Sequence, residues 1–162
     1  MAKVIAICGK ICSGKSYYAK ILREKENSVI LSCDEITASL FDSNLGDKHD
    51  EMTKRIREYL LKKSVELVKV DTNVILDWGF WTQTDREYIT QYFKENNIPC
   101  EWHYINIDDD SWQKNIQERN KKVLDGTDTN NFYLDEGLMQ KLLSIWQEPC
   151  KNEIDVWYNI KR

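Results

Sequence analysis

The stretch Gly9-Lys10-Ile11-Cys12-Ser13-Gly14-Lys15-Ser16 decides how this sequence folds. It fits the pattern G-x-x-x-x-G-K-[ST] at every fixed position. An apolar β-type run, Val4–Cys8, leads into the stretch, and an amphipathic helical pattern over Gly14–Lys25 leads out of it. Because the pattern requires this order of strand, loop and helix, the sequence predicts a loop that holds the phosphates of a nucleotide.

Each residue type in this loop has a physical role. Gly9 and Gly14 allow backbone conformations that a side chain would forbid, so successive N–H groups can turn inward and form an anion nest. Lys15 brings a full charge to the β- and γ-phosphates, and the Ser16 hydroxyl is a natural Mg²⁺ ligand. The expected cofactors are therefore ATP and Mg²⁺. The residues expected to hold the nucleotide are Gly9, Lys10, Ile11, Cys12, Ser13, Gly14, Lys15 and Ser16.

Short β-type runs alternate with longer helical periods along the whole chain. The expected strands are Val4–Cys8, Val29–Cys33, Val74–Asp77, Trp102–Ile107 and Val156–Ile160. The expected helices are Gly14–Lys25, Asp50–Lys69, Thr84–Asn96, Ser111–Lys122 and Asp135–Gln147. Alternation of this kind predicts parallel strands joined by right-handed crossovers, and the continuous apolar runs indicate a sheet covered by helices on both faces. The expected fold class is α/β, in one domain over residues 1–162.

Acidic residues follow the predicted strands, where an open parallel sheet binds its ligands. Asp34, after the second strand, is the expected general base of a phosphoryl transfer, and the alternative is a helix N-cap for Glu35–Phe41. Asp77, after Val74-Ile75-Leu76, is expected to hold Mg²⁺, and the alternative is an aspartate in a strand-end turn. The run Asp108–Asp110 is typical of a helix N-terminus.

The residues after Asp77 are candidates for the acceptor pocket. Trp78, Phe80 and Trp81 surround one glycine at the mouth of a strand, so they can form flat apolar walls for an acceptor, with Asp34 beside them. The alternative is ordinary packing beneath the following helix. The segment 41–69 is expected to be a helical segment that helps to bind the acceptor.

A polar stretch, Val123–Leu134, is expected to be a mobile loop between two helices, within a lid over residues 119–135. Arg119 precedes it, so its guanidinium can clamp phosphates or stack on adenine as the lid closes. The alternative is a solvated arginine at the end of a helix.

Composition narrows the class of protein. The chain has 162 residues, a net charge of −4 and five cysteines without CxxC spacing, and its pI is about 5.3. The excess of acidic over basic residues counts against a nucleic acid as the acceptor. No apolar stretch approaches the roughly 18 residues that a membrane span needs. Reduced thiols and no signal peptide suggest a cytoplasmic protein, and the sequence does not set its oligomeric state.

Five features together resemble the small P-loop kinases of the AAA_33 group, which includes the kinase domain of phage polynucleotide kinase and is related to chloramphenicol phosphotransferase and the zeta toxins. They are the phosphate loop, Cys33-Asp34, Leu76-Asp77, Glu118-Arg119-Asn120 and Glu148-Pro149. The resemblance implies strand order 2-3-1-4-5 and ATP-dependent transfer to a hydroxyl. It also implies that Asp34 is the base, Lys15 and Ser16 the phosphate and Mg²⁺ residues, and Arg119 a lid arginine.

Three hypotheses follow from these features. The first is a kinase that transfers the γ-phosphoryl group to a small-molecule hydroxyl, with Lys15, Asp34 and Arg119 as catalytic residues. The second is a 5′-hydroxyl polynucleotide kinase, against which the low pI counts. Lys121 and Lys122 also count against it, because they stand where the polynucleotide kinase lid has a second arginine. The third is a non-catalytic, regulatory nucleotide-binding protein, against which Asp34 and Asp77 count.

Overall fold

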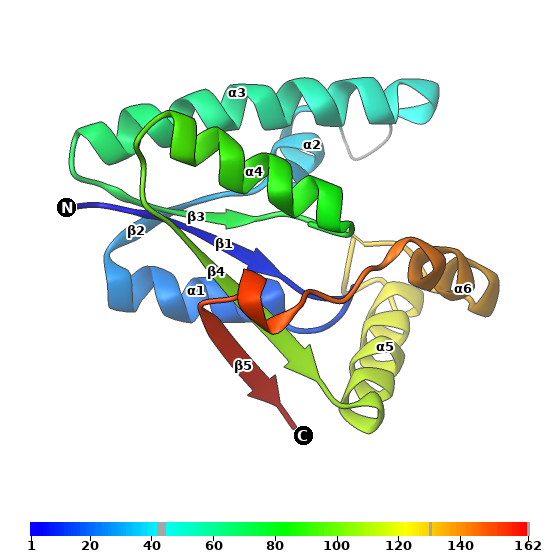
Figure 1. Ribbon diagram of the computed structural model, residues 1–162. Helices are drawn as coiled ribbons and strands as arrows, with labels where there is room; N and C mark the ends of the chain where they lie inside the picture. Colours follow the sequence, from blue (N-terminus) through cyan, green and yellow to red (C-terminus); the bar gives the residue numbers. More distant parts are fainter. Residues whose placement is uncertain (42–44, 130, 162) are drawn as a thin grey trace.

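The computed structural model describes residues 1–41, 45–129 and 131–161. Its centre is a five-stranded sheet of order β2-β3-β1-β4-β5, in which every neighbouring pair is parallel (Figure 1). The strands are β1 Val4–Cys8, β2 Ser28–Leu31, β3 Asn73–Asp77, β4 Cys100–Ile107 and β5 Val156–Ile160. The helices are α1 Lys15–Glu26, α2 Cys33–Phe41, α3 His49–Lys69, α4 Gln83–Glu95, α5 Asp109–Leu124 and α6 Glu136–Ile145, with short 3-10 turns at Gly46–Lys48 and Lys151–Glu153. The predicted α/β class and the strand order are confirmed.

The middle strand carries the phosphate loop. All five residues of β1 are buried, as expected of a strand with neighbours on both sides and helices on both faces. Its register pairs Ile7 with Asp77 of β3 and Cys8 with Tyr104 of β4. Asp77 therefore lies beside Ile7, just before the phosphate loop, although the two residues are far apart in sequence.

Helices cover both faces of the sheet, as Figure 1 shows. On one face α1 buries Ala19 and Leu22 against Ile5 and Ile75. On the other face α3 and α4 pack on the alternate side chains of the same strands, in a larger cluster that includes Leu60. The alternation of β1 side chains between the two clusters follows from the period of two in a strand.

Side-chain caps set where several helices begin. Thr82 accepts a hydrogen bond of 3.1 Å from the Asp85 N–H, and Asp108 accepts one of 2.9 Å from the Ser111 N–H. These caps set the start of α4 at Gln83, just before the predicted Thr84, and the start of α5 at Asp109, within the run Asp108–Asp110 that predicted a helix N-terminus.

The second strand differs from its prediction. It ends at Leu31, because Ser32 accepts the Glu35 N–H at 3.3 Å and Cys33 already starts α2. Asp34 thus lies in the first helical turn, and the alternative that it caps Glu35–Phe41 is wrong. The acid instead benefits from the positive end of the helix dipole.

Two predicted segments lie partly outside the described residues: 42–44 of the expected acceptor segment 41–69, and residue 130 of the expected lid 119–135. Within the described part of the chain, no helix has both the length and the apolar character to cross a membrane. All five cysteines are free thiols.

Candidate active site

The backbone of the phosphate loop has the geometry that its glycines predict. Gly14 has φ of +100° and Cys12 has φ of +59°, both in the left-handed region. A Cβ at Gly9 would meet the Ser13 hydroxyl at 2.6 Å and the Ile105 carbonyl at 3.1 Å. The loop therefore closes against β4 only because position 9 lacks a side chain.

Lys15 lies folded over the loop. Its Nζ donates to the carbonyls of Gly9 at 3.2 Å and Lys10 at 3.4 Å. Burial lowers the pKa of Lys15, and the nearby carboxylates of Asp77 and Asp34 oppose that effect. These bonds to neutral carbonyls are long, and Lys15 forms no ion pair with a carboxylate among the described residues.

Ser16 and Asp77, the two residues expected to hold Mg²⁺, are in direct contact. The Ser16 hydroxyl donates to Oδ2 of Asp77 at 2.8 Å. Burial raises the pKa of Asp77, while the Lys15 charge and the Ser16 hydrogen bond oppose the rise. A hydroxyl and a carboxylate are the oxygen donors that Mg²⁺ prefers, so the residues present fit that ion.

Asp34 is exposed in the first turn of α2 and faces the same end of the sheet. Its charge reaches Lys15, since it is one of the two carboxylates that raise the lysine pKa. The structure therefore brings Lys15, Ser16, Asp34 and Asp77 to one place, at the carboxyl ends of β1, β2 and β3.

One face of α5 holds the outer side of the loop. Trp112 donates from Nε1 to the Ile11 carbonyl at 2.7 Å, and Asn115 donates to the Cys12 carbonyl at 2.8 Å. Arg119 follows on the same face, with Nη1 3.5 Å from the Cys12 sulfur. Of these residues only Arg119 was predicted. The available signal was the spacing i, i+3, i+7, which puts the three side chains on one side of a helix.

Lys10 does not point into the loop. Its Nζ lies 4.2 Å from the centre of the Trp112 ring and 4.0 Å from the Asp109 carboxylate. Lys10 can therefore contribute its backbone, but not its side chain, to the predicted anion nest. The contact with Trp112 adds a cation–π interaction to the docking of α5 on the loop.

The expected lid is more tightly held than its composition suggests. Helix α5 continues to Leu124, so the loop starts two residues later than predicted. At the other end, Asn120 donates to the Leu134 carbonyl at 2.9 Å and accepts the Leu134 N–H at 2.7 Å. Leu134 is buried in a cluster with Ile107 and Trp112. The expectation of a mobile loop over the whole of Val123–Leu134 is therefore wrong at both ends.

Arg119 is poised next to this loop. Its guanidinium carbon lies 5.3 Å from the centre of the Phe132 ring, and its Nε has no partner among the described residues. It thus stands between the phosphate loop and the described part of the lid, as a clamp residue would.

Two of the three acceptor aromatics are core residues. Trp78 is 2% exposed and Phe80 is 1% exposed, and Trp78 donates from Nε1 to the Leu31 carbonyl at 2.8 Å. The alternative of ordinary packing therefore holds for these two residues, because rings covered to this extent cannot present a face to a ligand. The stretch after β3 turns inward so that its aromatics fill the space beneath α3 and α4.

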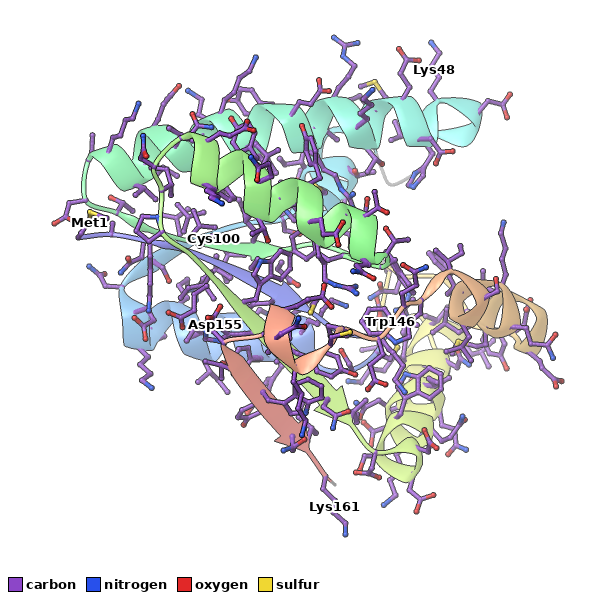
Figure 2. All side chains as sticks on the ribbon, in the orientation of Figure 1. Met1, Lys48, Cys100, Trp146, Asp155 and Lys161 are labelled. Carbon is purple, nitrogen blue, oxygen red and sulfur yellow. The ribbon has the colours of Figure 1, made fainter. Side chains whose placement is uncertain are left out.

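Trp81 is half-buried on the other side of Gly79, and its ring occupies the space that a Cβ at Gly79 would need. It meets Trp146 edge-on, with 6.2 Å between ring centres, and its carbonyl accepts the Gln147 N–H at 2.8 Å. Trp146 lies in the segment between α6 and β5, near the strand ends (Figure 2). Trp81 therefore anchors the chain that returns from α6 toward β5.

Arg86, near the start of α4, is a buried structural residue. Its side chain is 2% exposed, donates to the Phe80 carbonyl at 2.9 Å and pairs with Glu153 at 3.1 Å. It joins α4 to the turn before β5 and does not reach the surface.

Comparison with known proteins agrees with this geometry. Three of the solved structures that share the fold illustrate the range of relatives. They are a sugar kinase from a Janibacter species (12% identity, TM-score 0.63, covering 98% of this chain and 86% of that one), the APS kinase CysC of Mycobacterium tuberculosis with AMPPNP and APS (15%, 0.61, 99% and 90%), and a chain of the Pnkp1/Rnl/Hen1 RNA repair complex (17%, 0.68, 89% and 43%).

Identities this low show the fold alone. No curated protein sequence matches the chain. The AAA_33 family, described as an AAA domain, matches residues 4–140, which span the phosphate loop, Asp34, Asp77 and Arg119. The chain has the P-loop kinase fold and belongs to the AAA_33 family.

Proposed function

We propose that this protein is a kinase that transfers the γ-phosphoryl group of ATP, with Mg²⁺, to a hydroxyl of a small-molecule acceptor. The observation that carries the proposal is the 2.8 Å hydrogen bond between Ser16 and Asp77. It joins the phosphate loop to a carboxylate at the end of β3, within the electrostatic reach of Lys15. A phosphate-binding turn with a structural role alone would not need charged groups of both signs gathered beside it.

Each residue has a role in the proposed transfer. The loop amides and Lys15 bind the β- and γ-phosphates, and Arg119 clamps them from α5. Ser16 and Asp77 hold Mg²⁺, which when bound neutralises phosphate charge. Asp34 orients the acceptor hydroxyl and takes its proton, while the acceptor oxygen bonds to phosphorus and the bond to the β-phosphate oxygen breaks, releasing ADP.

A small-molecule acceptor is favoured over a polynucleotide. The APS kinase with a similar fold acts on a small molecule, whereas a chain of the RNA repair complex is similar over 43% of its length. The net charge of −4 opposes binding to a phosphate backbone. Lys121 and Lys122 follow Arg119 and lack the bidentate fork of a second arginine.

The test separates nucleotide binding from transfer. ATP and GTP binding are measured by calorimetry with and without Mg²⁺, and transfer from ATP labelled at the γ-phosphate is followed with a small-molecule hydroxyl library and with a 5′-hydroxyl oligonucleotide. We expect Mg²⁺-dependent ATP binding and label on a small molecule. Label on the oligonucleotide alone would select the polynucleotide kinase, and ATP binding without transfer to any acceptor would select the regulatory protein.

A further inference from the structure

A groove of about 590 Å³ lies between the first halves of α3 and α4. Both halves point toward the carboxyl ends of the strands, as Figure 1 shows. Its floor consists of Leu61, Phe80 and Ile89, which all belong to the core and are buried. The volume is in the range of sites for small molecules, and a rigid floor keeps such a site open before a ligand arrives.

Polar side chains of both signs form the rim of the groove. Asp50, Lys54 and Glu58 come from successive turns of α3, and Thr84 and Asp85 come from the first turn of α4. Within residues 1–41, 45–129 and 131–161, the side chains of these five form no ion pair or hydrogen bond with one another. Nor do they bond to any other residue within these ranges, so their donors and acceptors are available to a ligand.

Arg57 closes the inner end of the groove and connects it to the active site. Its Nη2 donates to the Gly79 carbonyl at 3.0 Å, two residues beyond Asp77. Burial raises the pKa of the Cys33 thiol to about 11, and the adjacent Arg57 guanidinium opposes the rise. Cys33 precedes Asp34 in α2. One side chain of the groove thus contacts both chain segments that carry the strand-end aspartates.

We infer that the α3–α4 groove is the acceptor site of the proposed kinase and that it takes a neutral polyhydroxyl compound, of the sugar or cyclic polyol class. The inference rests on the proposed function and names its substrate class. An apolar floor accommodates the C–H face of such a ring, while alternating carboxylates, hydroxyls and cations can bond its vicinal hydroxyls.

The balance of charge argues against an anionic acceptor. Asp50, Glu58 and Asp85 carry three negative charges on the rim, against two positive charges on Lys54 and Arg57. A phosphorylated or carboxylated ligand would add to the excess of negative charge in a partly enclosed space. A neutral ligand avoids that repulsion and still uses every donor.

The experiment is a titration of the protein, loaded with AMP-PNP and Mg²⁺, with named probes. The neutral probes are D-glucose, D-ribose and myo-inositol, and the anionic probes are D-gluconate and glucose 6-phosphate. Backbone amide shifts identify the site and give the affinity. The groove variants are Glu58→Gln, which removes one rim charge at constant shape, and Thr53→Trp, which fills the groove. Matched controls on the exposed surface of α3 are Glu51→Gln and Lys62→Trp.

We expect a neutral probe to shift amides of the groove, with about 10-fold weaker binding in Glu58→Gln, none in Thr53→Trp and no change in the controls. Glu58→Gln keeps the test valid if Thr53→Trp does not fold. The inference is overturned if no neutral probe shifts these amides, if an anion binds more tightly, or if binding ignores both variants. AMP-PNP binding is recorded in parallel: its absence from the wild-type protein overturns the proposed function, whereas its presence with a silent groove overturns this inference alone.

Discussion

The Ser16 hydroxyl is hydrogen-bonded to the Asp77 carboxylate at 2.8 Å across 61 residues of sequence. The contact exists because β1 and β3 are neighbours, with Ile7 paired to Asp77. It brings the first turn of α1 and the end of β3 together, so that the Asp77 carboxylate lies beside the phosphate loop.

Replacing Asp77 with asparagine tests its proposed role in Mg²⁺ binding. Asp77→Asn keeps an oxygen for the Ser16 hydroxyl but removes the charge that would attract Mg²⁺, so we expect transfer to need a higher Mg²⁺ concentration. The measurement is the Mg²⁺ dependence of turnover at saturating ATP. A matched control is Asp71→Asn, before the start of β3. An unchanged Mg²⁺ requirement would remove Asp77 from the metal site.

The same variant has a predicted effect on stability in the absence of nucleotide. Burial raises the pKa of Asp77 above its value in the unfolded chain, so ionisation costs more in the folded state and stability falls as pH rises through the folded pKa. Asp77→Asn should therefore be more stable than wild type at pH 7, and the gain should vanish at a pH below 3.8, the unperturbed value. Urea unfolding at both pH values measures it. A gain that grows in acid would contradict the assignment.

Lys15→Ala should abolish phosphoryl transfer and weaken ATP binding. The variant removes the charge on the β- and γ-phosphates while the amides of the loop remain. Calorimetry and turnover measure the two effects, with exposed Lys20→Ala of the same helix as the control. Normal turnover in Lys15→Ala would reject the assignment of the phosphate loop.

Asp34→Asn should separate binding from chemistry. The amide keeps the shape of the side chain but cannot accept the hydroxyl proton, so we expect transfer to fall by about 10² or more while ATP affinity changes by only a few-fold. Glu35→Gln, the next residue and also exposed, is the control. If ATP binding were lost together with the rate, Asp34 would be a metal or structural residue instead.

The lid should respond to nucleotide in its exposed part only. Amide exchange over residues 125–129, which are mostly exposed, should slow with AMP-PNP and Mg²⁺ and lose that protection in Arg119→Ala. The Leu134 amide, bonded to Asn120 at 2.7 Å, should be protected without nucleotide and become fast in Asn120→Ala. Exchange over 125–129 that ignores nucleotide or Arg119 would show that this loop is not a lid gated by the arginine.

Arg86 is expected to matter for stability. Arg86→Met leaves Glu153 without its partner in a nearly buried pair, and breaking such a pair costs about 3–5 kcal/mol of the free energy of unfolding. The exposed pair Arg23–Glu24 is the matched control, and Arg23→Met should change stability by less than about 1 kcal/mol. Denaturant unfolding measures both. Equal losses in the free energy of unfolding for Arg86→Met and Arg23→Met would show that the Arg86–Glu153 pair does not stabilise the fold.

Local patterns in the sequence determined the phosphate loop, the alternation of strands and helices, and the acidic residues at the strand ends. These features depend on neighbours within a few positions, on glycine conformations and on periodicity, which a sequence displays directly. The family resemblance added the strand order, which the sheet confirms.

Contacts between distant segments were decided only by the tertiary structure. From the sequence, Trp78 and Phe80 fit the walls of a pocket and the core equally well. In the structure they pack beneath α3 and α4 and belong to the core. Trp112 and Asn115 reach the loop because α5 crosses its outer side, and Leu134 is held because Asn120 lies opposite it. An aromatic or amide side chain has the same composition in either setting, so its role depends on which distant backbone the fold brings within hydrogen-bonding distance.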